Sequence, residues 1–200
     1  MQTYRIYLVR HGLTQANEVG AYIGQTDLPL SAAGLKALQQ LKNSGEGLSV
    51  EKVYTSPLLR ARQTAAVLFP DFHAEEMPEL TEFDFGEFEG KTAAQLENNP
   101  DFAAFVSGRL SAPPGGEDQR AFAERICLGY RHMVENMMDC GIHTAAAVLH
   151  GGVIMTLLSC SAMPRRKSVE WTCAPGHGFE TLVTPSLYQR SGVIEVTASF

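Results

Sequence analysis

The sequence predicts an α/β fold, a three-layer α/β/α sandwich with a mostly parallel central sheet and helices on both of its faces. Strand patterns and helix patterns alternate along most of the 200 residues, which favours parallel strands joined by helical crossovers. Three predicted strands each end in a polar or cationic element, and crossovers of one hand place those ends at one edge of the sheet. No Pro-, Gly- or Ser-rich linker divides the chain, so we expect a single domain over residues 1–200.

The first part of the chain is predicted to hold two strands and two helices. Tyr4–Val9 is an apolar run that predicts a buried strand. Ser31 is a candidate N-cap for a helix whose leucine stripe runs to about Asn43. Lys52–Thr55 is a second short strand. Ser56 and Pro57 follow it as a predicted N-cap and first helical position, and the helix they open is expected to stop near Pro70.

The middle of the chain is less regular. Residues 76–117 are rich in glycine and proline, with short helical patterns only near 92–98 and 101–107. A long irregular segment inside a compact α/β domain is typical of a functional loop. We therefore expect a lid or substrate-facing insertion at about 76–117.

The last part returns to regular elements. Asp118–Asp139 has the apolar spacing of a long amphipathic helix, and Thr144–Leu149 is a third buried strand. Val153–Cys160 is predicted to be helical. Two late strands follow at Gly178–Thr184 and Val193–Ala198, and the last of them is a candidate edge strand for pairing between two chains.

Composition excludes several classes of protein. The formal net charge is −6 and the pI about 5.5, which disfavours a general surface for nucleic acid. No apolar run reaches the length of a membrane span, so we expect no membrane partner and a cytoplasmic location. The four cysteines form no C-x-x-C pair and are expected to be reduced structural thiols.

The three strand ends gather cations and imidazoles. Arg10 and His11 follow the first strand, Arg60 lies in the first turn of the next helix, and His150 follows the third strand. Arginine presents a planar fork of donors that matches phosphate oxygens, and a helix N-terminus also favours an anion. A metal site is the alternative for the two histidines, but the adjacent arginines would repel a divalent ion and no carboxylate lies at ligand spacing. The pattern favours a phosphoryl site.

Phosphoryl chemistry at such a site needs a nucleophile and a proton donor. The free imidazole nitrogen of His11 can attack phosphorus while the arginines neutralise the phosphoryl oxygens. The proton for the leaving oxygen would come from the middle segment. Glu82 stands between apolar and aromatic neighbours that would raise its pKa, with Asp84 and Glu87 as rivals from the same stretch.

Six blocks of sequence carry a resemblance to a known family. They are Leu8-Val9-Arg10-His11-Gly12-Leu13-Thr14 with Asn17, Gly24-x-x-Asp27-x-Pro29-Leu30-Ser31-x-x-Gly34, Tyr54-Thr55-Ser56-Pro57-Leu58-x-Arg60-Ala61-x-Gln63-Thr64-Ala65, Leu80-x-Glu82-x-Asp84-Phe85-Gly86-x-x-Glu89-Gly90, Pro114-Gly115-Gly116-Glu117, and Val148-Leu149-His150-Gly151-Gly152. In order and spacing they resemble the histidine phosphatase superfamily, also called phosphoglycerate mutase-like. Any one block would be a weak signal, whereas six in order are specific.

The resemblance implies a flavodoxin-like or Rossmann-like three-layer fold. It also implies phosphoryl transfer through a phosphohistidine at His11, with no metal and no cofactor. Arg10, Arg60 and His150 would form the phosphate pocket, and Glu82 would donate the proton. Four further substrate contacts are expected, from Asn17, the Gly151 backbone, Thr14 and Gln25.

Two departures from the family pattern refine the expectation. Leu13 stands where many members have glutamate, outside the pocket residues. Only Phe83–Pro114 fill the gap in which mutases carry a longer segment, which leaves the pocket open to water and favours hydrolysis. The chain looks most like the α-ribazole phosphatase and broad-specificity phosphatase branch. We expect a phosphomonoesterase of small phosphorylated metabolites; a phosphoglycerate mutase and a non-catalytic phospho-ligand binding module are the alternatives.

For a few charged residues near the expected site, the sequence allows two interpretations. Arg165-Arg166-Lys167 is either a solvated loop or an attraction for a second anionic group, and Arg62 either a surface ion pair or a substrate contact. His177 is a candidate for the pocket rim. Glu87 and Glu89 are expected near the mouth, where they would disfavour highly anionic substrates. The chain is expected to be a monomer or a homodimer.

Overall fold

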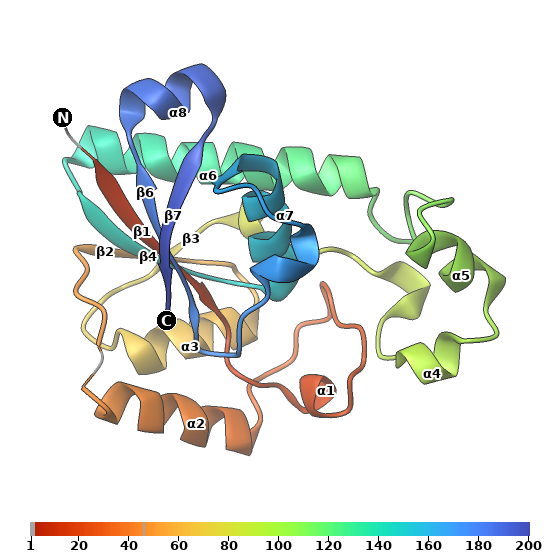
Figure 1. Cartoon of the computed structure of the whole chain (residues 1–200). Coiled ribbons are helices and arrows are strands. Elements are labelled where there is room, and N and C mark those ends of the chain that lie inside the picture. The colour runs from red at the N-terminus through yellow and green to blue at the C-terminus, as the bar shows by residue number, and fades with distance from the viewer. Residues whose placement is uncertain (1–2, 46) are drawn as a thin grey trace.

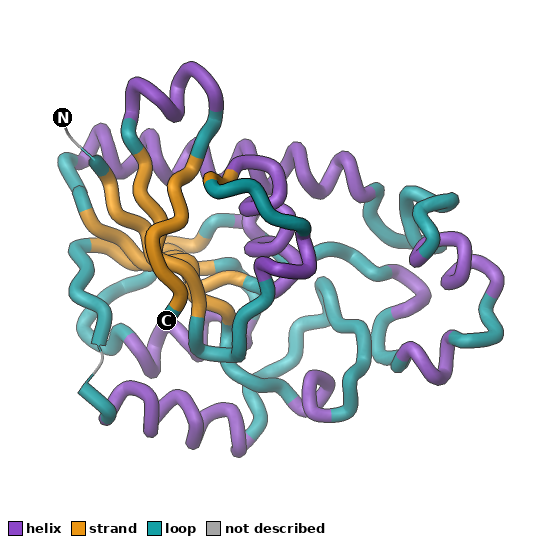
Figure 2. The backbone as a smooth tube through the Cα atoms, in the orientation of Figure 1, coloured by secondary structure: helices purple, strands orange, loops and turns teal. Residues whose placement is uncertain are grey.

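The computed structural model describes residues 3–45 and 47–200, and these residues form one seven-stranded sheet with the order β3-β2-β4-β1-β6-β7-β5 (Figures 1 and 2). The strands are β1 (Tyr4–Arg10), β2 (Lys52–Thr55), β3 (Glu75–Glu76), β4 (Thr144–Leu149), β5 (Ala162–Met163), β6 (Gly178–Val183) and β7 (Ile194–Ser199). Four strand pairs are parallel, and the two pairs that β6 makes with β1 and β7 are antiparallel. The predicted mostly parallel sheet is confirmed.

Helices cover both faces of the sheet, with α6 and α7 on one side and α2 and α3 on the other (Figure 1). The helices are α1 (Gln15–Glu18), α2 (Ala32–Asn43), α3 (Leu59–Leu68), α4 (Ala93–Leu96), α5 (Pro100–Val106), α6 (Gln119–Cys140), α7 (Gly151–Ser161) and α8 (Pro185–Ser191), with 3-10 turns η1 (Pro78–Leu80), η2 (Gly86–Phe88) and η3 (Ser168–Trp171). The predicted three-layer α/β/α sandwich is therefore confirmed.

The alternation of side chains along β1 explains the two-sided core. Ile6 and Leu8 pack into the cluster that holds the apolar stripe of α6 and α7, whereas Tyr7 and Val9 pack with Ala61 of α3. Successive side chains of a strand point to opposite faces, so an apolar run without alternation requires a layer on each side. β1 meets that requirement at the centre of the sheet, where it pairs with β4 and β6.

The long helix α6 begins and ends where the sequence signals it. The Asp118 carboxylate accepts hydrogen bonds from the backbone N–H groups of Arg120 and Ala121, which satisfies donors that the first turn leaves unpaired. The helix ends at Gly141, whose φ of 67° is in the left-handed region that glycine adopts without strain. Ile126, fully buried on its inner face, anchors it to the sheet, and truncating such a residue to alanine typically costs about 2–5 kcal/mol.

Two local expectations are wrong. The helix after β2 does not begin at the Ser-Pro pair, because α3 starts at Leu59 with Leu58 at the N-cap position and no side-chain cap. β7 is not an edge strand, since β5 pairs with its Ile194 and Glu195. The first of these differences matters for the site, because it frees the Ser56 side chain for another role.

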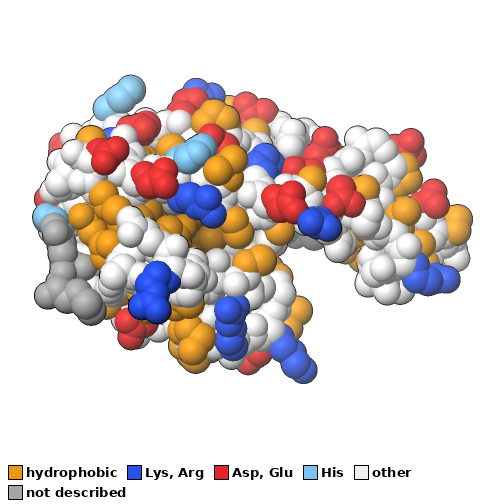
Figure 3. All heavy atoms as spheres, turned by 90° about the horizontal axis from the view of Figure 1, so that it is seen from above, with side chains coloured by type: hydrophobic (Ala, Val, Ile, Leu, Met, Phe, Trp, Pro, Cys, Tyr) orange, Lys and Arg blue, Asp and Glu red, His pale blue; other side chains and the backbone are white. Residues whose placement is uncertain are grey.

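The middle segment forms a lobe beside the main body. In Figure 1, α4 and α5 lie beyond the N-terminal end of α6, and the space-filling view shows this lobe projecting sideways (Figure 3). Acidic and basic side chains are interspersed on the face seen in Figure 3. Across the described ranges, no helix has the length and apolar character needed to cross a bilayer.

Candidate active site

Parallel pairing of β1 and β4 brings the two site histidines together. The register places Arg10 of β1 opposite Leu149 of β4, so the residues that follow, His11 and His150, leave the sheet side by side. Their ring centroids are 5.1 Å apart at an interplanar angle of 60°. The carboxyl ends of parallel strands are where open α/β sheets bind ligands. The predicted convergence of the two histidines is present in the structure.

His11 is buried and held in one orientation. Its side chain is 5% exposed, and its Nδ1 lies 2.7 Å from the Gly12 carbonyl oxygen, which can only accept a hydrogen bond. Burial and the nearby Arg60 lower the pKa of His11 to about 3. The ring is therefore neutral near pH 7 with its proton on Nδ1, and Nε2 carries a free lone pair. A neutral imidazole with a free nitrogen is the form that attacks phosphorus.

Two arginines surround His11 and are fixed by backbone carbonyls. Arg10 Nη1 donates to the Cys173 carbonyl at 2.7 Å, and Arg60 donates to the carbonyls of Gly24 and Thr26 at 2.6 and 3.1 Å. Within residues 3–45 and 47–200 neither guanidinium forms a salt bridge. Burial lowers the pKa of Arg60, but an arginine stays protonated in proteins. The site thus holds two positive charges without a paired carboxylate.

His150 is completely buried and also neutral. Burial and then the neighbouring His11 and arginines hold its pKa well below the ordinary range. Its Nε2 lies 2.7 Å from the Ser56 hydroxyl oxygen. Its Nδ1 has no hydrogen-bond partner among the described residues, and the same is true of the buried Nε of Arg10. Buried polar atoms are normally hydrogen-bonded, so these two nitrogens are suited to bind the oxygen atoms of an anionic group.

Glu82 brings a carboxyl group into the same cluster. It is 6% exposed, and its two oxygens accept hydrogen bonds from the backbone N–H groups of Phe83 at 2.8 Å and Gly152 at 2.9 Å. Burial raises its pKa, and the two backbone hydrogen bonds and the arginines oppose that rise without cancelling it. A carboxyl with a raised pKa beside an anion site is suited to donate a proton.

The two rival carboxylates have other partners. Asp84 accepts the backbone N–H of Gly86 at 2.8 Å and so closes a turn. Glu87 is exposed. Neither makes the contacts that place Glu82 against α7, so the structure favours Glu82 among the three candidates.

The N-terminus of α7 faces the arginine pocket. A Cβ atom added to Gly151 would lie 3.5 Å from Arg10 Nε, which places the first backbone turn of the helix beside that guanidinium. The first N–H groups of a helix have no intrahelical acceptor and attract anions. The predicted contact of the Gly151 backbone with a phosphate group is compatible with this geometry.

The expected substrate contacts Thr14, Asn17 and Gln25 have structural partners of their own. Thr14 and Asn17 form a capping box at the start of α1, in which each side chain accepts from the other residue's backbone N–H. Gln25 is exposed, and its amide donates to the Glu82 carbonyl at 3.5 Å. Their contact with substrate stays a prediction.

Sequence reasoning missed the role of Glu89. Its carboxylate accepts the backbone N–H groups of Gly24 at 3.2 Å, Gln25 at 2.8 Å and Thr26 at 2.9 Å, and also the Thr26 hydroxyl. Although burial raises the pKa of Glu89, the hydrogen bonds from Thr26, Gln25 and Phe85 lower it below its ordinary range. Glu89 therefore holds the loop whose carbonyls fix Arg60. The expectation that Glu89 disfavours highly anionic substrates at the pocket mouth stays a prediction, and these contacts show that the same carboxylate also has a structural role.

Most of the other charged candidates are engaged elsewhere. Arg62 forms an ion pair with Glu76 at 3.7 Å on the surface, as expected. Arg165 donates to the Cys160 carbonyl at 2.7 Å, and the Arg166 guanidinium lies 4.8 Å from the centre of the Trp171 ring. His177 lines a separate cavity of about 140 Å³ with residues of α2 and α3, and none of the residues of the histidine–arginine cluster lines that cavity.

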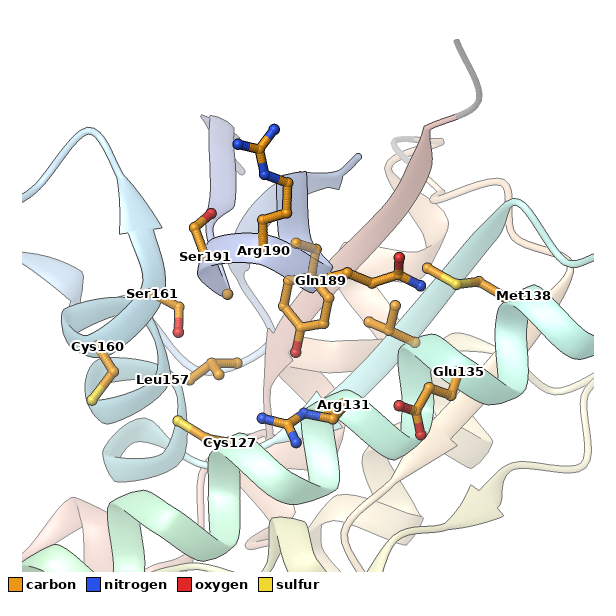
Figure 4. Close-up of a pocket in the computed structure, with 13 residues that line it drawn as sticks. Cys127, Arg131, Glu135, Met138, Leu157, Cys160, Ser161, Gln189, Arg190 and Ser191 are labelled. Atoms are coloured by element: carbon orange, nitrogen blue, oxygen red, sulfur yellow. The ribbon is translucent and has the colours of Figure 1, made fainter. Parts of the chain in front are cut away.

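A larger hollow lies at the C-terminal end of α7, whereas the histidine–arginine cluster lies at its N-terminal end. The hollow has a volume of about 640 Å³ and opens between α6, α7 and α8, where Figure 4 shows Arg131, Arg190, Cys127 and Cys160 around it. None of the predicted site residues lines it. The chemistry predicted from sequence is thus concentrated at the N-terminal end of α7, away from this hollow.

Comparison with known proteins places this site in a family. The model of the histidine phosphatase superfamily, branch 1, matches residues 6–174, a range that includes both histidines, both arginines and Glu82. The chain belongs to this family. The predicted resemblance, and with it the prediction of a phosphatase enzyme, is confirmed.

Several relatives of this histidine phosphatase carry names that specify a substrate. It is 31% identical to the adenosylcobalamin/α-ribazole phosphatase of Salmonella typhimurium over 78% of both chains. The Escherichia coli enzyme of the same name is 35% identical over 61% of this chain and 63% of that protein.

Solved structures show the same architecture across the family. A candidate α-ribazole-5′-phosphate phosphatase from Escherichia coli superposes with a TM-score of 0.80 and 25% identity, over 98% of this chain and 95% of that one. A phosphoglycerate mutase from Thermus thermophilus superposes with a TM-score of 0.71 and 30% identity, over 98% of both chains. Phosphatases and a mutase therefore share this fold.

Proposed function

We propose that this protein is a metal-independent phosphomonoesterase that acts through a phosphohistidine at His11. The observation that carries the proposal is the buried cluster around His11. In the part of the chain that the structure describes, its two arginines have no ion-pair partner, and two of its buried nitrogens, Arg10 Nε and His150 Nδ1, have no hydrogen-bond partner. A phosphoryl group supplies both the negative charge and the acceptor oxygens that this cluster lacks.

The reaction would proceed in two steps. His11 Nε2 attacks phosphorus, a nitrogen–phosphorus bond forms, the ester phosphorus–oxygen bond breaks, and neutral Glu82 gives its proton to the leaving oxygen. Water then attacks the phosphohistidine, Glu82 carboxylate takes a proton from that water, and inorganic phosphate and neutral His11 are released. Arg10, Arg60 and His150 would bear the charge of the phosphoryl oxygens in both steps.

The acid and the nucleophile both support catalysis rather than mere binding. A non-catalytic phospho-ligand module needs the arginines, but it needs neither a histidine with a free nitrogen nor a buried carboxyl of raised pKa. His11 and Glu82 provide both features in the same cluster. We infer that a phosphate ester bound at this cluster is hydrolysed and not simply retained.

We propose small phosphate esters as substrates, with α-ribazole 5′-phosphate as the first candidate because the named relatives support it. The short segment between Phe83 and Pro114 does not by itself separate hydrolysis from mutase activity, because the Thermus thermophilus mutase superposes over 98% of both chains. The mutase among the solved structures makes phosphoglycerate interconversion the second candidate. We also propose that residues 76–117 act as a lid, and that the protein acts in the cytoplasm as a monomer or homodimer. Its four unpaired cysteines support that location.

The decisive experiment compares the protein with its His11→Ala variant. The wild type should hydrolyse p-nitrophenyl phosphate and one member of a panel containing α-ribazole 5′-phosphate, phosphoglycerates and sugar phosphates, with activity unchanged by EDTA. His11→Ala should be inactive while its circular dichroism spectrum stays native. Retained activity in that variant refutes the phosphohistidine. A coupled assay that detects phosphoglycerate interconversion dependent on a bisphosphate primer would instead establish the mutase.

A further inference from the structure

The hydroxyl group of Ser56 is a part of the site that the proposed mechanism does not use. Ser56 follows β2 at the same edge of the sheet that carries His11 and His150, and its side chain is fully buried. It provides no cap to α3, which begins three residues later without a side-chain cap. Its contact is with His150 Nε2, 2.7 Å from its Oγ.

The hydrogen bonds of Ser56 determine the direction of this contact. Its Oγ accepts the Leu58 backbone N–H at 3.3 Å. In the described part of the chain, His150 Nε2 is the only acceptor within reach of the Ser56 hydroxyl proton. A buried hydroxyl whose proton has no acceptor is costly. The hydroxyl therefore donates to Nε2, and Nε2 accepts.

The protonation state of His150 completes the assignment. The ring is neutral because it is buried beside His11 and two arginines, so it carries one proton. If Nε2 accepts from Ser56, that proton is on Nδ1. Nδ1 is the nitrogen that is buried without a partner. The opposite tautomer would leave the serine proton without an acceptor and turn a lone pair, rather than an N–H, toward a bound anion.

We propose that Ser56 is a positioning residue that fixes His150 as its Nδ1–H tautomer, so that His150 donates this proton as a hydrogen bond to a phosphoryl oxygen. No proton is transferred and no bond to phosphorus involves either residue. The functional part of this inference rests on the proposed phosphatase function. The tautomer itself is a property of the resting protein and can be measured without any substrate.

The tautomer is measured by nitrogen NMR on protein labelled at histidine. The wild type should show His150 protonated at Nδ1, Ser56→Thr should keep that state, and Ser56→Ala should move it toward the Nε2–H form. Thr55→Val is the matched control, because its buried hydroxyl contacts the Ser56 carbonyl and not His150. An Nε2–H tautomer in the wild type, or no change in Ser56→Ala, overturns the proposal. Neither outcome bears on whether His11 is the nucleophile.

The consequence for turnover is tested by a double-mutant cycle. Ser56→Ala should lower kcat/KM for p-nitrophenyl phosphate, and weaken inhibition by inorganic phosphate, by about 10- to 100-fold. This range is taken by analogy from residues that fix the tautomer of metal-binding histidines. In the His150→Ala background the same substitution should have almost no further effect. An equal loss in both backgrounds would show that Ser56 acts through packing and would overturn the functional role, provided that all variants keep native circular dichroism spectra.

Discussion

The contact between Gly152 and Glu82 gives the sharpest prediction for the proton donor. A Cβ atom at position 152 would lie 2.5 Å from Glu82 Oε1 and 3.0 Å from its Cδ. Ordinary non-bonded contacts are about 3.5 Å or more, so in Gly152→Ala the carboxyl must retreat by about 1 Å. Retreat also lengthens the 2.9 Å hydrogen bond from the Gly152 N–H that fixes the carboxyl.

The expected cost depends on the leaving group. A displacement of about 1 Å can reduce a rate by about 100-fold when a step depends on the displaced group. An alkyl phosphate such as glycerol phosphate depends on Glu82, because an alkoxide leaves poorly without a proton. p-Nitrophenyl phosphate depends on it little, because p-nitrophenolate is a stable anion. Gly152→Ala should therefore lower kcat/KM by about 100-fold for the alkyl ester and only a few-fold for the aryl ester.

Gly151→Ala is the matched control for this comparison. Its Cβ would lie 3.5 Å from Arg10 Nε, an ordinary contact on the phosphate side of the cluster, so any loss should be the same for both esters. Glu82→Gln should reproduce the selectivity of Gly152→Ala. Thermal unfolding shows whether the variants are folded. Equal losses for both esters in Gly152→Ala would refute the assignment of Glu82 as the acid.

Three further predictions follow from the charges of the site. Activity on alkyl phosphates should rise with pH through the pKa of His11 at about 3, because the nucleophile must be neutral. It should fall again as the pH passes the raised pKa of Glu82, because the acid must be protonated. In a pH–rate profile, Glu82→Gln should remove this fall at high pH. In denaturant titrations without phosphate, the unfolding free energy should fall by about 1.4 kcal/mol per pH unit on account of His11 as the pH drops from 6.5 to about 3, because in this range only the unfolded chain protonates the His11 ring. Above pH 6.5 this loss should be absent. The unfolding free energy of His11→Asn should depend less on pH in the acid range, and an unchanged dependence contradicts the burial argument. Glu89→Gln should loosen the loop that holds Arg60 and raise KM by about tenfold with a smaller change in kcat, since a lost hydrogen bond to a charged group costs about 1.5–3 kcal/mol; an unchanged KM would show that Arg60 keeps its position without Glu89.

The convergence of the proposed site residues was predictable because these residues are marked locally. His11 and His150 each follow an apolar run, and a parallel sheet brings the ends of such runs together whatever the intervening loops do. Arg60 is marked by its place in the first turn after β2. Glu82 is marked by apolar neighbours that foretell burial. For these residues, the apolar periodicity of the chain predicts the strands and helices, and the handedness of the crossovers predicts that their ends meet.

The contacts of Ser56 and Glu89 were not predicted because their partners lie far away in the sequence. A serine before proline at the start of a helical pattern is the usual sign of an N-cap, and only the position of His150, 94 residues later, shows otherwise. Glu89 contacts Gln25 across 64 residues. Nothing in the local pattern separates a carboxylate that binds a loop from one that faces solvent. The same limit applies to β7, whose position inside the sheet depends on pairing with the two residues of β5.

The first turn of α7 unites the two halves of the proposed chemistry. His150 presents its unpartnered Nδ1 at the N-cap position, the Gly151 backbone lies beside Arg10, and the Gly152 N–H holds Glu82. Three consecutive residues thus touch the phosphate pocket and the acid, so the distance between them is set by one rigid piece of backbone. Because bare backbone makes the last two contacts, a side chain at 152 would push the acid away from the phosphate. Geometry therefore requires a glycine at position 152, whereas a Cβ at position 151 makes only an ordinary contact, and this requirement makes the selectivity of Gly152→Ala between leaving groups a direct measure of how closely acid and phosphate must be held.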